Sequence, residues 1–315
     1  MAFSRSLPPF LLGALLVAAA QLWVGCNPSS DASPPASPDT VGLPDSVLTP
    51  PDAATARRFA DVMQHGMEQR AETESIGALM QTLGTQFTDA PYLEGTLDEP
   101  PTERLVVRLD GFDCVTFIET TLAMARGVAA NDTTYAGFAQ RLAEQRYRNG
   151  QLQGYCSRLH YFTEWLADNE DRGLVDRLDD DLGSRSLTDT LDFMSTHRSD
   201  YDRFATNDSL YACIQDMEAS LQARQQQDPV RYVPQDSIRA VYDELQAGDI
   251  VAMVTSIDGL DVSHSGLVYA HDDGGRGLLH ASLSDGIVVS PDLQRYVQTN
   301  DNQIGIVVAR PQSGP

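Results

Sequence analysis

Cys114 is the residue of this sequence whose type and position best suit nucleophilic chemistry. It follows Asp113, a good helix N-cap, and apolar residues such as Val115 and Ile118 recur after it at helical spacing. The first turn of a helix offers unpaired backbone N–H groups and the positive end of the helix dipole, and both favour a thiolate over a thiol. The competing interpretation is a small buried cysteine that packs as a hydrophobe, as most free cysteines do.

Two histidines are candidates for the base that a cysteine nucleophile requires. His264 opens a run of apolar residues with strand character, where a polar side chain projects from the edge of a sheet. His280 lies near the middle of the next such run. If the two runs pair through the turn at 272–275, the imidazoles come close across the hairpin. Each histidine taken alone is more often a surface residue or a satisfied core residue.

The elements that must position these residues follow a simple order along the chain. Helical spacing of apolar residues comes first, and short runs rich in Val and Ile, separated by Gly and Asp turns, come last. The predicted helices cover 53–83 and 113–126, and the predicted strands cover 249–257, 264–270, 277–283, 286–290 and 304–309. This order predicts an α+β domain with an antiparallel sheet.

Five short motifs in this order resemble those of the NlpC-type cell-wall cysteine hydrolases. Gly-Phe-Asp-Cys-Val-Thr-Phe at 111–117 is similar to the Phe-Asp-Cys-Ser/Thr-x-Phe nucleophile motif of that family. The others are Pro-Tyr-Leu-Glu-Gly at 91–95, Ala-Gly-Asp-Ile-Val at 247–251, His-Ser-Gly-Leu-Val-Tyr at 264–269 and Leu-His-Ala at 279–281. The resemblance implies Cys114 as the nucleophile, His264 as the base and His280 as the third catalytic residue.

The resemblance also implies a fold and a chemistry. The fold is a papain-like NlpC-type core, in which N-terminal helices that include the nucleophile helix pack on a C-terminal antiparallel sheet at about 245–310. The mostly helical and acidic segment at about 135–230 is then a helical insertion. Neither a cofactor nor a metal is expected, and the sequence shows no close group of histidines and carboxylates with zinc-ligand spacing.

Further segments narrow the resemblance to the N-acetylmuramoyl-L-alanine amidase-like branch. They are Asp-Cys-Val-Thr-Phe-Ile-Glu from 113, Tyr-Arg-Asn-Gly from 147, Ser-Arg-Leu-His-Tyr from 157 with Trp165, Phe-Met-Ser from 193 and Gly-Ile-Val-Val-Ala-Arg from 305. The branch implies hydrolysis of the amide between N-acetylmuramic acid and L-alanine in soluble muropeptides. Three alternatives remain: an endopeptidase that cuts between D-glutamate and a diamino acid, a cysteine acyltransferase, and a catalytically inactive wall-binding lipoprotein.

Six residues near these motifs are predicted to bind the substrate, namely Tyr92, Ser157, Arg158, His160, Tyr161 and Trp165. Muropeptide stems carry carboxylates, which an arginine binds well in a bidentate manner, and aromatic rings stack on sugar faces. The alternatives are an Arg158 that pairs with carboxylates of the protein itself, a Tyr92 buried in a turn, and aromatic residues that belong to the core.

The N-terminus predicts export and a lipid anchor. Arg5 precedes an apolar run that ends at Gly25 and Cys26, which suggests a lipoprotein signal peptide at 1–25 and lipid attachment at Cys26. An ordinary signal peptide with an incidental cysteine is the alternative. Residues 26–52, rich in Pro, Ser and Asp, predict a flexible tether before an amidase domain at 53–315. Asn27 after Cys26 favours a periplasmic protein anchored to the outer membrane.

Charge and cysteine count limit the partners and the redox state. The net charge of −23 and the pI near 4.4 exclude nucleic acid as an expected partner, which leaves muropeptides and the membrane. In an oxidising compartment an odd number of cysteines after Cys26 leaves at least one thiol unpaired. A Cys156–Cys213 disulfide is possible but does not follow from the sequence, and it would leave Cys114 as the free thiol.

Overall fold

The computed structural model describes residues 50–314 except 74 and 101. The predicted signal peptide, Cys26 and the tether as far as residue 49 lie outside the described residues. Among the residues that are described, no helix is long and apolar enough to cross a membrane.

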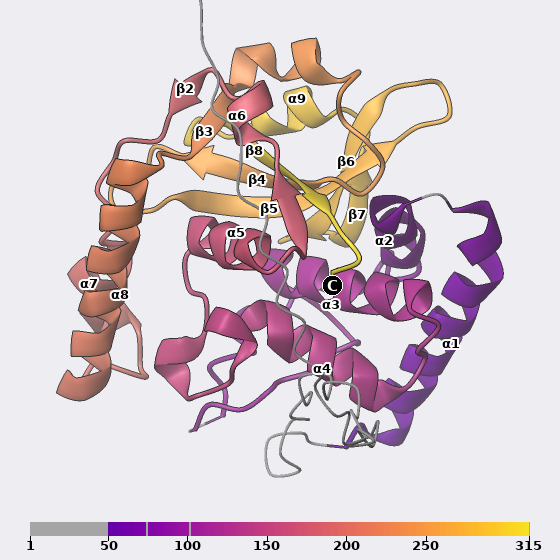
Figure 1. The fold of residues 1–315 in the computed structure, drawn as a ribbon, viewed down its shortest axis with the longest axis horizontal. Coiled ribbons are helices and arrows are strands. Elements are labelled where there is room, and N and C mark those ends of the chain that lie inside the picture. The colour runs from indigo at the N-terminus through magenta and orange to yellow at the C-terminus, as the bar shows by residue number, and fades with distance from the viewer. Residues whose placement is uncertain (1–49, 74, 101, 315) are drawn as a thin grey trace, which may run out of the picture. The chain divides into compact units, whose positions relative to one another are not determined.

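An antiparallel sheet of eight strands forms the frame of the described chain (Figure 1). The strands follow the order β2-β3-β8-β4-β5-β6-β7, and β1 pairs with the C-terminal end of β8. Their bounds are β1 Val175–Arg177, β2 Arg185–Ser186, β3 Arg231–Pro234, β4 Ile250–Thr255, β5 Val262–Ala270, β6 Arg276–Ser282, β7 Gly286–Ser290 and β8 Gln303–Pro311. The five Val- and Ile-rich runs correspond to β4 to β8, so the α+β prediction with an antiparallel sheet is confirmed.

Nine α-helices and five short 3-10 turns accompany this sheet in the described residues. The α-helices are α1 Ala53–Gln69, α2 Ile76–Thr85, α3 Cys114–Ala129, α4 Tyr135–Arg146, α5 Phe162–Asp171, α6 Asp179–Leu182, α7 Phe193–Thr196, α8 Asp208–Gln227 and α9 Leu293–Val297. The 3-10 turns are η1 Arg70–Glu72, η2 Arg148–Gly150, η3 Tyr155–Ser157, η4 Arg198–Asp200 and η5 Gln235–Val241. The single helix predicted at 53–83 is divided, because Ser75 caps a new helix at the backbone N–H of Ala78.

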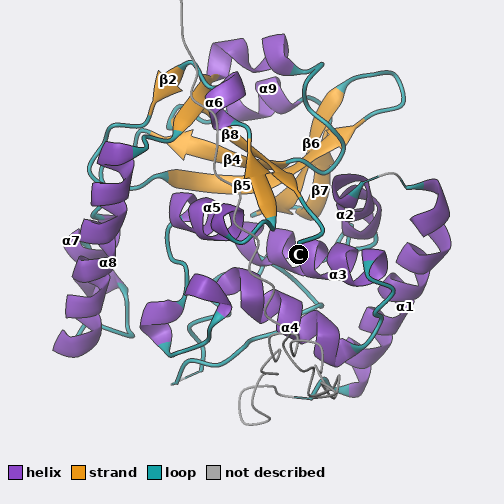
Figure 2. Cartoon of the chain, in the orientation of Figure 1, coloured by secondary structure: helices purple, strands orange, loops and turns teal. Residues whose placement is uncertain are grey.

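The two faces of the sheet bury different helices (Figure 2). One face packs against α2, α3 and α5, and α1 and α4 join the same core from the far side of α3, through side chains that include Phe117 and Leu122 of α3 and Leu267 and Leu279 of the sheet. The opposite face packs against α9 and η5, and Val268 and Leu278 point to that side. This alternation follows from the two-residue period of a strand, which sends neighbouring side chains to opposite faces. Helix α3, which begins at Cys114, is therefore packed on the sheet.

The segment from 135 to 230 is only partly a helical insertion. Phe138 of α4 and Trp165 of α5 belong to the same buried core as α3, and residues 175–177 form strand β1. A separate small core lies further along, where Met194 and Phe204 pack against α8. The prediction of one helical insertion was too broad, because α4 and α5 use their apolar faces to cover α3.

A disulfide joins this outer part to the loop that precedes α5. Cys156 in η3 is bonded to Cys213 in α8, with a Cα–Cα distance of 6.1 Å. The disulfide that the sequence only allowed is thus present, and Cys114 is the free cysteine among the described residues.

Candidate active site

The first turn of α3 is fixed by a reciprocal cap. The side chain of Asp113 accepts a hydrogen bond from the backbone N–H of Thr116 at 2.7 Å, and the Thr116 hydroxyl accepts one from the backbone N–H of Asp113 at 3.0 Å. Cys114 is the first residue of the helix and is partly buried. Asp113 is therefore the predicted N-cap, and the backbone N–H of Cys114 is one of those at a helix start that have no partner within the helix.

The nucleophile helix meets the sheet where β5 and β6 separate. The pairing of β5 with β6 covers Leu267 to Ala270, so residues 262–266 of β5 extend beyond it. In this extension Ser265 lies beside Cys114 and lowers the pKa of the thiol, while its buried hydroxyl has no hydrogen-bond partner among the described residues. The strand thus places a polar residue next to the thiol at the point where the sheet opens.

His264 and His280 form a hydrogen-bonded pair across the β5–β6 hairpin. The Nε2 atom of His264 lies 2.9 Å from the Nδ1 atom of His280, and the two rings are nearly perpendicular, at 88°. Gly266 makes this approach possible, because a Cβ atom at that position would lie 2.9 Å from the Cβ atom of His280. The glycine in His-Ser-Gly therefore has a steric role, and the predicted meeting of the two imidazoles across the hairpin is observed.

A small cavity of about 110 Å³ brings the cysteine and the first histidine together. Its lining comes from the start of α3, from the segment that leads into α5, and from the start of β5. The lining residues are Cys114, Val115, Leu159, His160, Tyr161, Phe162, Trp165, Leu260, Asp261, Val262, Ser263, His264 and Ser265. The Nε2 atom of His264 is hydrogen-bonded to His280, so the Nδ1 atom of His264 is the ring nitrogen that could accept a proton from the thiol.

Burial keeps both members of the pair of histidines neutral. It lowers the pKa of His264 to about 4, and it lowers the pKa of His280 to about 3, with a smaller contribution from the neighbouring His264. The ring of Tyr296 in α9 covers both, with centroids 4.5 Å from His280 and 5.9 Å from His264. A neutral imidazole at neutral pH retains the lone pair that a base needs.

Burial also determines the protonation of Cys114, in the direction opposite to the sequence prediction. It raises the pKa of the thiol to about 11, the adjacent Asp113 raises it further, and the contacts with Ser265 lower it only in part. The helix terminus was expected to favour the thiolate, but the loss of water around the sulfur has the larger effect. At neutral pH the thiol of Cys114 therefore keeps its proton, and the imidazole of His264 is neutral.

Three of the six predicted substrate residues line the cavity: His160, Tyr161 and Trp165. The Nε2 atom of His160 is bonded to the carbonyl oxygen of Tyr155 at 3.0 Å, so this nitrogen carries the proton and Nδ1 is the acceptor. The hydroxyl of Tyr161 donates to Glu218 at 2.8 Å, so only its ring is available to a ligand. Trp165 is buried and stacks on Phe162, with ring centroids 5.3 Å apart.

The other three predicted substrate residues lie outside the lining of this cavity. Tyr92 is half-buried close enough to Cys114 for a thiolate there to raise its pKa, although burial is the main cause of that rise. The Ser157 hydroxyl donates to the carbonyl of Gly154 at 2.7 Å and stabilises its own turn. Tyr92 therefore remains a neighbour of the nucleophile, whereas Ser157 does not.

Arg158 belongs to an internal ion-pair cluster rather than to the cavity. Its guanidinium is 6% exposed and lies 2.5 Å from Asp98 and 3.7 Å from Glu103. Glu103 also accepts a hydrogen bond from the Tyr147 hydroxyl at 3.0 Å and lies 3.5 Å from Arg203. We call these five residues the Glu103 cluster. The prediction that Arg158 holds a substrate carboxylate does not fit this arrangement, because carboxylates of the protein already occupy the guanidinium.

Sequence reasoning did not identify three further residues around the site. The buried Asp261 accepts hydrogen bonds from the backbone N–H and hydroxyl of Thr163 at 2.7 and 2.8 Å, which ties α5 to the start of β5. Ser290 lies 3.2 Å from the Nε2 atom of His280, and Tyr296 covers the histidine pair. Asp261 resembles an ordinary turn residue in the sequence, and the other two lie between the recognised motifs at 279–281 and 305–310, so no local signal marked them.

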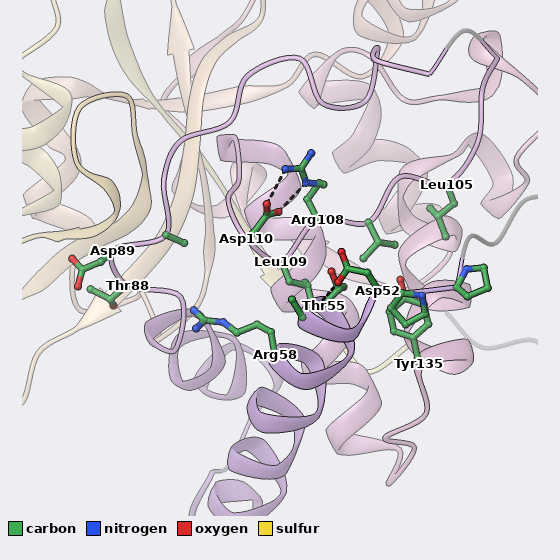
Figure 3. Close-up of a pocket in the computed structure, with 15 residues that line it drawn as sticks. Asp52, Thr55, Arg58, Thr88, Asp89, Leu105, Arg108, Leu109, Asp110 and Tyr135 are labelled. Carbon is green, nitrogen blue, oxygen red and sulfur yellow. Dashed lines mark hydrogen bonds and ion pairs between the residues drawn. The ribbon is translucent and has the colours of Figure 1, made fainter.

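A larger cavity of about 740 Å³ lies elsewhere, beside the start of α1 (Figure 3). Arg108 and Asp110 form an ion pair at its wall, and Asp52 caps α1 at Thr55. None of the described residues that line it is a cysteine or a histidine. Within the described part of the chain, no group of three or more His, Cys, Asp or Glu side chains is arranged to hold a metal ion. Size alone therefore does not select the reactive site.

Comparison with known proteins gives one family and several similar structures. Residues 82–306 match the family described as N-acetylmuramoyl-L-alanine amidase-like. A crystal structure of an N-acetylmuramoyl-L-alanine amidase from Bacteroides uniformis is 30% identical with a TM-score of 0.70, over 75% of this chain and 99% of that one. No match is found among curated proteins.

Two further structures are similar. A protein from Bacteroides fragilis, described as a candidate xylanase, is 32% identical with a TM-score of 0.65, over 72% of this chain and 98% of that one. A protein from Legionella pneumophila is 19% identical with a TM-score of 0.59, over 83% of this chain and 97% of that one, and its likeness concerns the fold alone.

Proposed function

Because this chain belongs to the N-acetylmuramoyl-L-alanine amidase-like family, we propose that it is a cysteine hydrolase that cleaves the amide between N-acetylmuramic acid and L-alanine in muropeptides. The observation that carries the proposal is the shared cavity. One wall holds the free thiol of Cys114 at the start of a capped helix, and another holds His264, whose far nitrogen is bonded to His280. A nucleophile, a base and a group that orients the base are the parts that acyl transfer requires.

In the first half of the proposed reaction, the sulfur of Cys114 attacks the lactyl carbonyl carbon of the muramic acid. The thiol proton passes to the Nδ1 atom of His264, since the starting pair is neutral. The oxyanion that forms can accept a hydrogen bond from the backbone N–H of Cys114 at the helix start. His264 then gives its proton to the departing nitrogen of L-alanine, and a thioester is left on Cys114.

In the second half, water hydrolyses the thioester. His264 removes a proton from the water as its oxygen attacks the acyl carbon, and the C–S bond then breaks. The sugar acid leaves as a carboxylate, and the sulfur takes back its proton. Throughout, the bond between the Nε2 atom of His264 and the Nδ1 atom of His280 keeps the ring of the base in one orientation.

The chemistry of the cavity supports an acyl-transfer enzyme over a glycosidase. A glycoside hydrolase generally needs two carboxyl groups on either side of the scissile bond. The one carboxyl group in the lining belongs to Asp261, whose oxygens accept hydrogen bonds from Thr163 and from the backbone of Val262. The xylanase description of one similar structure therefore has no counterpart in the cavity of this chain.

The same catalytic residues could also act on other bonds of the muropeptide or with an acceptor other than water. An endopeptidase that cuts after D-glutamate would use the same cysteine and histidines on a different bond, and an acyltransferase would replace water by another acceptor. His160 through its Nδ1 acceptor, the rings of Tyr161 and Trp165, and Tyr92 are the proposed substrate contacts. We further propose export to the periplasm, with a lipid on Cys26 that holds the enzyme at the outer membrane.

The decisive experiment is mass spectrometry of anhydro-muropeptides incubated with the full-length protein in detergent. The matched control is Cys114→Ala. Free stem peptide that begins with L-alanine, absent in the control, is the expected product. A sugar fragment that retains L-alanine and D-glutamate would instead identify an endopeptidase, and intact muropeptide with a folded wild-type protein would contradict a hydrolase.

A further inference from the structure

Ser290 is the third member of a line of polar residues across the sheet. Strand β6 pairs with β7, so that His280 lies opposite Val288 and Leu278 lies opposite Ser290. Residues two apart on a strand share a face, which puts Ser290 diagonally next to His280. The distance from the Nε2 atom of His280 to the Ser290 hydroxyl oxygen is 3.2 Å. His264 occupies the corresponding diagonal position on the other side, on β5.

The donor in each of these two hydrogen bonds follows if His264 is to accept a proton from the thiol. If the Nδ1 atom of His264 is free to take the thiol proton, its Nε2 atom carries the hydrogen and donates it to the Nδ1 atom of His280. A neutral His280 then carries its own hydrogen on Nε2 and must donate it to an acceptor. The Ser290 oxygen is the partner that the structure gives that nitrogen.

The opposite arrangement would disable the base. If His280 carried its hydrogen on Nδ1, it would donate to the Nε2 atom of His264, and the remaining hydrogen of a neutral His264 would then be on Nδ1 and face the thiol. Both imidazoles are held neutral by burial, and the ring of Tyr296 covers His280 at 4.5 Å. The Ser290 hydroxyl could donate to Nε2 in this second arrangement, but in the first arrangement it is the acceptor without which the Nε2 hydrogen of His280 would be buried and unpaired.

We propose that Ser290 is a positioning residue, which accepts the Nε2 hydrogen of His280 and thereby stabilises the tautomer in which His264 can act as the base. This inference rests on the proposed function only in taking His264 as the base of the reaction. The hydrogen bonds from His264 to His280 and from His280 to Ser290 exist in the protein without substrate. Ser290 is not among the described residues that line the cavity, and its hydroxyl is bonded to His280, so it acts through His280.

The first test is the nitrogen NMR spectrum of the histidine side chains in the full-length Cys114→Ala protein in detergent. The ring shifts should show hydrogen on Nε2 for both His264 and His280. If the Nδ1 atom of His280 carries the hydrogen instead, the proposal is wrong, and no Ser290 variant is needed to show it. Because this measurement needs no substrate, it remains valid if the enzyme cleaves a different bond.

The second test uses Ser290→Ala and Ser290→Thr, with Ser284→Ala as the control. Ser284 lies in the turn of the same hairpin and is exposed. Ser290→Ala should lower kcat by about threefold to tenfold, the value of one neutral hydrogen bond, with little change in KM. In the Cys114→Ala background the same change should give a mixture of tautomers at His264.

The Thr variant decides whether the hydroxyl or the space it fills is responsible. Ser290→Thr keeps an acceptor and should restore both kcat and a single tautomer, and Ser284→Ala should match the wild type. A fall in kcat without a change in tautomer, or a Thr variant as impaired as the Ala variant, would overturn the positioning role. If the wild-type protein cleaves no muropeptide, the proposed function fails, and the tautomer measurements still decide the role of Ser290.

Discussion

Two groups of polar residues in this protein are built on opposite principles. The His264–His280 pair is neutral, is joined by one hydrogen bond of 2.9 Å and borders the cavity through His264. The Glu103 cluster is charged: Arg158 pairs with Glu103 and with the more exposed Asp98, Arg203 pairs with Glu103, and no described member of the cluster lines the cavity. Only Leu159 separates Arg158 from His160, yet one belongs to the cluster and the other to the cavity.

The comparison shows why proximity to the site does not imply a catalytic role. Each charged group of the cluster has a fixed partner of opposite charge, and the removal of one would leave another unpaired in a place with little water. The histidine pair differs because burial holds both rings neutral, so the pair carries no fixed charge. Five experiments follow from this distinction, and the first four are ordered from the largest expected effect to the smallest.

The largest effect is expected at the nucleophile. Cys114→Ala should lower kcat/KM for muropeptide cleavage by at least about 1,000-fold, because no other group in the cavity can form the thioester. The melting temperature should change little, since the side chain is small and partly exposed. His264→Ala should be similarly inactive, and the double variant should be no worse than either. Strictly additive losses would contradict a single catalytic unit.

The Glu103 cluster should show the reverse pattern. Arg158→Met should lower the free energy of unfolding by about 3–5 kcal/mol, because Glu103 loses a buried partner. The matched control is Arg224→Met, which removes an exposed ion pair with Asp171 and should cost about 0–1 kcal/mol. Chemical denaturation measures both. If the Arg158→Met protein is as stable as the wild type and its KM is greatly raised, Arg158 binds the substrate and the prediction is wrong.

The disulfide should have an intermediate effect on stability and little on rate. Cys156→Ser combined with Cys213→Ser opens a link between residues 57 apart and should cost about 2–4 kcal/mol of unfolding free energy. Neither cysteine lines the cavity, so kcat at low temperature should stay close to the wild-type value. A collapse of kcat comparable to that of Cys114→Ala would mean that the disulfide positions the catalytic residues.

The smallest effect is expected for mild acidification of the active enzyme. The pKa of His264 is lowered by burial to about 4, so the base remains neutral and the rate should hardly change between about pH 7 and pH 6. The acidic limb of the rate profile should lie well below the ordinary histidine value. A limb centred near pH 6.5 would show that the imidazole is not buried in the working enzyme.

The lowered pKa values of His264 and His280 also make the free energy of unfolding depend on pH. As the pH falls from 6.5 towards 4, the unfolded chain binds protons at His264 and His280 that the folded protein refuses, so the free energy of unfolding decreases. The contribution of the pair is complete above pH 6.5 and is lost as the pH approaches the folded-state values. His264→Ala should weaken this dependence, whereas Arg224→Met should leave it nearly unchanged, because the ion pair of that arginine with Asp171 is exposed.

Much of the fold was predictable because it rests on local patterns. Asp113 caps α3 as its residue type suggests, and the Val- and Ile-rich runs became β4 to β8 with the α+β arrangement that their order implied. The predictions that differed were those that tertiary packing decides. Ser75 interrupts the first helix, and α4 and α5 join the main core instead of an insertion.

The candidate site shows the same division. The sequence indicated the Cys114, His264 and His280 that the structure brings together, because the residues around them form recognisable motifs. It could not show that Arg158 would be occupied by Asp98 and Glu103, which lie some 60 and 55 positions earlier in the chain, since such partners meet only after folding.

The sequence by itself therefore determined the reactive residue types, the helix that begins at Cys114 and the order of strands that carries the histidines. Only the tertiary structure decided the protonation of the thiol, the disulfide between Cys156 and Cys213, and the hydrogen bond that His280 makes to Ser290. The reason is physical. Helix caps and strand periods depend on neighbours in sequence, whereas burial and hydrogen-bond direction depend on groups that folding brings from distant parts of the chain.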